Sequence, residues 1–186
     1  LLAYSSIAQI GYMTLGLSFN NLNGLSGGLV HIFNHGVMKG GLFLVVGCIT
    51  YRIHSSSIED MAGLGRRMPF TMGAFVIGGL GLIGVPATAG FISKWYLVLG
   101  AFETGNWWIA LLILFSSLLA VVYVWKVVEV AYFREPPEGS EPCEAPLSML
   151  IPTFILIGSS LYFGLQTDLT AHLATNAAQA LMGGGG

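Results

Sequence analysis

Charge is scarce in this chain of 186 residues. Asp, Glu, Lys and Arg make up only 9% of the residues, whereas about a quarter is usual in a soluble domain. So few charges cannot cover a globule in water, which argues against a soluble enzyme. The formal net charge of −2 leaves no basic surface for DNA or RNA. The length and composition together predict a single domain built in lipid.

The chain also lacks the motifs of metal and cofactor sites. Cys48 and Cys143 lie far apart and form no CxxC pair, which argues against a zinc site and a disulfide framework. No nucleotide, nicotinamide or iron–sulfur motif is present, and no nucleophile–base pair is apparent. We therefore expect no metal, no cofactor and no catalytic residue within this chain, so that enzyme activity of its own is the less favoured reading.

The first residues contain no initiator methionine and no basic region of a signal peptide. The chain starts Leu1-Leu2-Ala3-Tyr4, from which we expect a fragment whose upstream part is missing. The terminal run Gly183 to Gly186 is native or foreign, and it plays no part in the fold prediction.

Apolar runs are abundant, since 54% of the residues are hydrophobic and the mean hydropathy is +0.76. A bilayer core of about 30 Å needs about 20 apolar residues in one helix. We predict an all-α polytopic membrane bundle of five to six segments, one of them a broken helix. The stretches that approach or meet the required length are 2–19, 25–51, 68–85, 107–133 and 147–165.

A shorter apolar piece, residues 91–102, follows a cluster of helix-breaking residues. Gly81, Gly84, Pro86 and Gly90 remove helix-stabilising groups just before it. Backbone groups freed at membrane depth are tolerated only where protein or water satisfies them. The pattern predicts a discontinuous helix, a feature that marks the ion path in transporters.

Two loops differ in charge. Arg52, Arg66 and Arg67 give the loop of residues 52–67 more positive charge, which by the positive-inside rule favours the cytoplasm. Residues 134–146 form an acidic connector among prolines, and only Arg134 offsets its acids. These acids are Glu135, Glu138, Glu141 and Glu144. Residues 168–182 are mildly amphipathic and predict a short interfacial helix or a frayed tail.

Ionisable groups within a span are costly in lipid and are functional by default. His31, His35 and Lys39 recur every four residues, which places them within an arc of about 80° on one helix face. Histidine titrates near neutral pH, and a buried lysine releases its proton more readily than one in water. The ladder therefore favours proton transfer. The alternative is that the histidines only bond neighbouring helices.

Two further lysines are candidates for the same role. Lys94 directly follows the predicted break, where freed carbonyls and water can solvate it, although Trp95 and Tyr96 also suit a lysine that reaches for the membrane surface. Lys126 lies late in its span, and an ion pair with Glu129 explains it as well as a functional role does.

Three segments resemble the C-terminal half of the antiporter-like proteins. They are residues 2–13 (LAYSSIAQIGYM), 31–43 (HxxxHxxxKxxLF) and 90–94 (GFISK). This superfamily includes subunits of Mrp-type sodium/proton antiporters, proton-pumping subunits of respiratory complex I, and the equivalent subunits of membrane-bound hydrogenases. Within it, residues 32–43 (IFNHGVMKGGLF) and 133–137 (FREPP) look most like the MrpD component of the antiporters.

The resemblance implies a division of the chain. Residues 1–134 correspond to a five-helix repeat that translocates protons, 135–146 to the acidic loop, 147–166 to an additional transmembrane helix and 167–186 to a tail. The first, inverted repeat with its glutamate–lysine pair is absent from this sequence. The family's orientation implies that residues 52–67 lie outside, against the charge bias, so the side of this loop stays open.

The resemblance also implies roles for individual residues. Lys39 corresponds to a midmembrane lysine, His31 and His35 to histidines that link proton half-channels, and Lys94 to the charged residue of the broken helix. We expect a proton-translocating subunit of a multisubunit Na⁺/H⁺ antiporter in a bacterial or archaeal cell membrane, with other membrane subunits, lipid, protons and sodium as partners. The alternatives are a proton-pumping subunit of an NADH-quinone oxidoreductase or membrane-bound hydrogenase, and a structural subunit that transports nothing.

Overall fold

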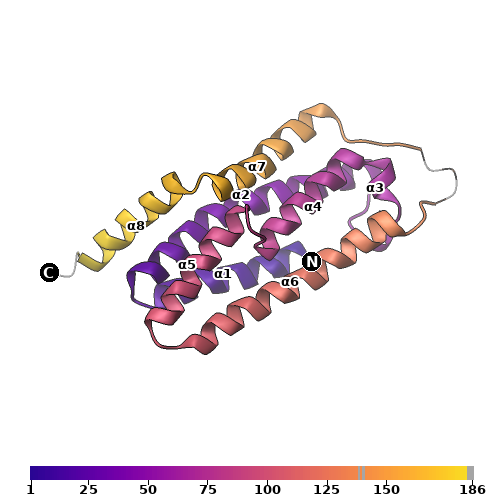
Figure 1. The fold of residues 1–186 in the computed structure, drawn as a ribbon. Coiled ribbons are helices and arrows are strands. Elements are labelled where there is room, and N and C mark those ends of the chain that lie inside the picture. Colours follow the sequence, from indigo (N-terminus) through magenta and orange to yellow (C-terminus); the bar gives the residue numbers. More distant parts are fainter. Residues whose placement is uncertain (138, 140, 184–186) are drawn as a thin grey trace.

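The computed structural model describes residues 1–137, 139 and 141–183, and these form helices and loops with no strand (Figure 1). The predicted all-α class is therefore confirmed. Glu138 of the acidic connector and residues 184–186 of the glycine run lie outside the described residues. Short η1 (Glu59–Met61) and α3 (Leu64–Arg67) join the longer helices. The longer helices are α1 (Leu2–Ser18), α2 (Leu22–Ile53), α4 (Pro69–Ile83), α5 (Ala89–Glu103), α6 (Trp107–Phe133), α7 (Leu147–Leu165) and α8 (Asp168–Gly183).

Helix α2 forms the centre of an elongated bundle, because α1, α4, α5, α7 and α8 all contact it (Figure 1). The Asn21 side chain caps its start by accepting a hydrogen bond of 2.7 Å from the Gly24 amide. Glycines allow the close approach of α1, since a Cβ on Gly16 would lie 2.6 Å from the Gly24 carbonyl oxygen. Small residues at such crossings are typical of helix packing in membranes.

The broken helix is present. Helix α4 ends at Ile83, Gly84 adopts φ +84°, and α5 starts only at Ala89. The two halves meet closely, because a Cβ on Gly90 would lie 2.0 Å from the Gly81 carbonyl oxygen. In the part of the chain that the structure describes, α2, α6 and α7 are long and apolar enough to cross a membrane, while α1 and the halves α4 and α5 are shorter. The chain is thus a multi-pass membrane protein.

The loop of residues 52–67 and the acidic connector lie at the same end of the bundle. The Cys143 amide donates to the Arg67 carbonyl oxygen at 3.0 Å, and Arg67 Nε donates to the Glu141 carbonyl oxygen at 3.2 Å. The Glu144 carboxylate accepts bonds from the amide and hydroxyl of Thr71 at the start of α4. Arg134 at the start of this connector therefore lies at the same end of the bundle as Arg52, Arg66 and Arg67.

Residues 168–183 form a helix that packs on α2, with Ala174 and Ala178 buried. This packing distinguishes α8 from a frayed tail. Helices α7 and α8 follow one another along the bundle in Figure 1. At the end of α7, a Cβ on Gly164 would lie 2.4 Å from the Thr88 carbonyl carbon, so this end of α7 presses directly on the break between α4 and α5.

Candidate functional site

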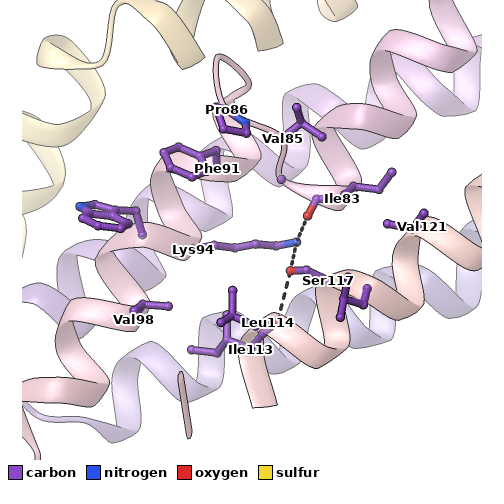
Figure 2. Close-up of a pocket in the computed structure, with 13 residues that line it drawn as sticks. Ile83, Val85, Pro86, Phe91, Lys94, Val98, Ile113, Leu114, Ser117 and Val121 are labelled. Carbon is purple, nitrogen blue, oxygen red and sulfur yellow. Dashed lines mark hydrogen bonds between the residues drawn. The ribbon is translucent and has the colours of Figure 1, made fainter. Parts of the chain in front are cut away.

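Lys94 turns into the break of the discontinuous helix and is 6% exposed. Its ammonium donates to the Leu82 carbonyl oxygen at 3.0 Å. It also donates to the Ile83 carbonyl oxygen at 2.8 Å and to Ser117 Oγ of α6 at 2.9 Å (Figure 2). The carbonyls at the end of a helix have no partner within that helix, so the break itself supplies the acceptors. This inward position differs from the alternative in which Lys94 reaches for the membrane surface.

Tyr12 of α1 links Lys94 to the histidines of α2. The Lys94 ammonium lies 5.2 Å from the centroid of the Tyr12 ring, within the range of a cation–π contact. The same ring meets the His31 ring edge to face at a centroid distance of 5.4 Å. The Tyr12 hydroxyl donates to the Ile113 carbonyl oxygen of α6 at 3.4 Å. The sequence offered no sign of this contact beyond the aromatic residue itself.

His31 and His35 stack one turn apart on α2, with ring centroids 6.1 Å from each other. His31 is 1% exposed, and its Nδ1 shares a hydrogen bond of 2.7 Å with Ser93 Oγ, one residue before Lys94. Nε2 of each histidine is buried without a hydrogen-bond partner among the described residues. The same holds for a few side-chain oxygens of α1 and α2, namely those of Gln9, Ser26 and Asn34. Buried polar atoms of this kind are commonly bridged by internal water.

Lys94, Tyr12, His31 and His35 follow one another in a row, called here the polar line. Lys39 lies at its far end, beside the start of α1. Its side chain is 4% exposed, and its ammonium donates to the Leu2 carbonyl oxygen at 2.7 Å and to the Ser5 hydroxyl. It also lies 5.9 Å from the centroid of the Phe43 ring. The half-buried His35 lies one turn away, so the structure places four of the five candidate residues in one line, three of them buried, that α1, α2 and α5 build together.

Lys126 is not part of this line. It lies on an exposed face of α6, and Glu129 pairs with Arg134 at 3.3 Å instead of with Lys126. Among the described residues, no group of three or more His, Cys, Asp or Glu could hold a metal ion. The arrangement therefore provides two buried ammonium groups, with two imidazoles and a tyrosine ring between them and serine hydroxyls beside them.

Known proteins resemble this chain in sequence and in fold. The family described as "NADH:quinone oxidoreductase/Mrp antiporter, TM" matches residues 1–120. The NADH-quinone oxidoreductase subunit N of Desulforudis audaxviator is 41% identical over 181 residues, which cover 90% of this chain and 36% of that protein. The chain thus spans somewhat more than a third of this relative.

Two solved structures share the fold. In the Mrp complex from Dietzia sp. DQ12-45-1b, one chain superposes with a TM-score of 0.88 at 24% identity, over 97% of this chain and 42% of that one. A chain of the membrane-bound sulfane sulfur reductase, an archaeal respiratory membrane complex, gives a TM-score of 0.79 at 32% identity, over 87% and 27% of the two chains.

Proposed function

Because the chain belongs to the NADH:quinone oxidoreductase/Mrp antiporter transmembrane family, we propose that it carries protons as part of a membrane subunit of such an assembly. The observation that carries this proposal is the line from Lys39 through the half-buried His35 to His31 and Lys94, in which both lysines and His31 are buried. Ionisable groups are costly in a membrane interior, and those found there commonly mark an ion or proton path.

In the proposed mechanism, each ammonium group loads and releases a proton, and the imidazoles pass it between them through either ring nitrogen. Loading at one lysine disfavours loading at the next. Charges on neighbouring groups of the line act in this way, since two charges about 10 Å apart interact by about 1.7 kcal/mol at an effective dielectric constant near 20. We assign a lesser part to Lys126, whose exposed position late in α6 suits exchange of protons with surface water.

Two assemblies suit this chain. The first is a Mrp-type antiporter that exchanges protons for sodium or another monovalent cation, and the match in fold with the Mrp complex supports it. The second is a redox-driven proton pump whose electrons are handled by other chains. The 41% identity to an NADH-quinone oxidoreductase subunit favours this second assembly. In both, the partners are other membrane subunits in a bacterial or archaeal cell membrane.

Proton flux in everted vesicles tests the function with the full-length protein in its complex. We expect Lys94→Ala and Lys39→Ala each to lower transport by at least about tenfold, because each removes a group that carries the proton, and a positioned proton-transfer group is usually worth at least this much. Lys126→Gln should lower transport less than about twofold. Dependence of the flux on added sodium supports the antiporter, and dependence on electron donors supports the redox pump.

Assembly of the complex is the control, measured for each variant by its yield after purification. If Lys39→Ala and Lys94→Ala assemble normally and transport protons at the native rate, the chain is a structural subunit and the proposal fails.

A further inference from the structure

A cavity of about 480 Å³ lies between the break and α6, with Lys94 extending across it (Figure 2). This volume falls within the range of about 300–1,000 Å³ that is usual for small-molecule sites. Its walls are mostly aliphatic and aromatic, among them Phe91, Val98 and Leu114. Apart from the indole of Trp95, the polar side chains of its lining are those of Lys94 and Ser117. The site thus suits an apolar molecule with one polar end.

The cavity borders the outer, apolar face of the bundle. Trp95, Leu114 and Leu118 line it and are 53%, 55% and 63% exposed. Such a face of a membrane protein meets lipid chains or other apolar helices, so a molecule that enters between α5 and α6 from the bilayer passes only apolar groups. The aliphatic lining therefore selects an acyl chain.

The inner end of the cavity selects a negative charge. All three donors of the Lys94 ammonium are used, but their acceptors are neutral oxygens, and the described residues give Lys94 no carboxylate partner. Ser117 Oγ also donates to the Ile113 carbonyl oxygen at 3.1 Å, so it keeps a partner when another acceptor displaces it from Lys94. A carboxylate oxygen in its place forms a charge-assisted bond, which is about twice as strong as a neutral one.

We propose that this cavity binds a long-chain carboxylate from the bilayer, a fatty acid, with its acyl chain between α5 and α6 and its carboxylate on Lys94. A phospholipid head group stays at the membrane surface, whereas Lys94 lies inside the break of a membrane helix. A fatty acid reaches this depth because it crosses the hydrocarbon core as the neutral acid. The bound carboxylate competes with proton transfer at Lys94, and only this last step rests on the proposed function.

Photolabelling of the full-length protein in its complex, in nanodiscs, tests the binding. The probe is a long-chain fatty acid with a diazirine on its chain, and labelled peptides are mapped by mass spectrometry. We expect label on the lining residues of α5 and α6, displacement by excess oleate, and at least about a tenfold loss of label in Leu114→Trp, which fills the cavity. The matched control is Leu111→Trp, since Leu111 is 53% exposed on α6 but lies outside this cavity, and its label should stay unchanged.

Three results would overturn the binding proposal. The label is insensitive to Leu114→Trp, or methyl oleate displaces the probe as well as oleate does, or other helices of the full-length protein cover the lining and keep it unlabelled. The transport step has its own readout. If oleate binds as expected yet leaves proton flux unchanged, the competition at Lys94 is wrong while the site stands. Failure of the proposed function shows separately, as native flux in Lys94→Ala.

Discussion

At the scale of single residues, the environment of Lys94 is the most informative part of the molecule. Two backbone carbonyls, one hydroxyl and one aromatic face surround its ammonium, and these groups come from α4, α6 and α1. A buried donor that loses one partner costs about 1–3 kcal/mol, and more when it is charged. Changes at the surrounding groups should therefore act on Lys94 without touching it.

Ser117→Ala removes the hydroxyl acceptor of Lys94 and leaves one proton of the ammonium unpaired. We expect this variant to lower the free energy of unfolding by about 1–3 kcal/mol and to lower proton flux several-fold. Thermal unfolding in detergent and vesicle flux measure the two effects. Ser116→Ala is the control, because Ser116 is the half-buried neighbour in sequence and does not bond Lys94. Equal effects of the two variants would contradict the assigned role of Ser117.

Two substitutions of Tyr12 distinguish the contribution of its ring from that of its hydroxyl. Tyr12→Phe keeps the ring face toward Lys94 and loses only the long bond to Ile113, so flux should stay within about twofold of the native value. Tyr12→Leu removes a cation–π contact worth about 0.5–2 kcal/mol, so flux should fall about two- to thirtyfold. If the Phe and Leu variants have the same flux, the ring plays no part.

At the scale of helices, the informative contact is the one between the α4–α5 break and α7. The break between α4 and α5 lies against the end of α7, where Gly164 approaches the backbone of Thr88. Helix α7 therefore holds the segment that orients Lys94, although it contributes no side chain to the polar line. A change in α7 should reach the site through this contact.

Gly164→Ala tests the contact. The added methyl group would lie 2.4 Å from backbone of Thr88, which cannot give way as a flexible side chain does. We expect a loss of about 1–3 kcal/mol in stability and a lower proton flux. In Gly158→Ala, on an open part of the same helix, nothing lies within 4 Å of the new methyl group, and stability should be unchanged or rise by about 0.5–1 kcal/mol. Equal stability of both variants would show that the contact between α7 and the break accommodates the added methyl group.

The broken helix was predictable because its causes are local. Gly84 and Pro86 interrupt the helix wherever the rest of the chain lies, and the four-residue spacing of the histidines and Lys39 fixes their shared face. The contact between Tyr12 and Lys94 joins residues 82 positions apart, so no local pattern announces it. The pairing of Glu129 with Arg134 was missed for a different reason, since the connector places Arg134 beyond the helix end.

At the scale of the whole molecule, charge is concentrated at one end. All four arginines of the sequence lie in or next to the loop of residues 52–67 and the connector, which hydrogen bonds join. The loops of the opposite end, residues 19–21 and 104–106, hold neither lysine nor arginine. The positive-inside rule then favours the cytoplasm for the arginine-rich end.

Thiol labelling measures this orientation. Cys143 is half-buried in the connector, whereas Cys48 is fully buried in α2. With other cysteines of the full-length protein replaced, we expect a membrane-impermeant maleimide to label Cys143 in everted vesicles but not in right-side-out ones, and to leave Cys48 unlabelled. Ser56→Cys, in a protein with Cys143→Ser, should show the same sidedness because both loops lie at one end. Labelling of the two positions from opposite faces would contradict the fold.

The carbonyls that hold Lys94 are the last of α4, and that helix end carries the negative pole of the helix dipole, about half an elementary charge. Within the described residues, the counter-charge of this lysine is thus the backbone at a helix end and not a side chain. Because the field of a helix end fades within about one turn, a slide of α4 by a few ångströms weakens the hold on the ammonium. A neighbouring subunit that displaces α4 can therefore change how strongly Lys94 holds its proton, without any charged group moving between the two subunits.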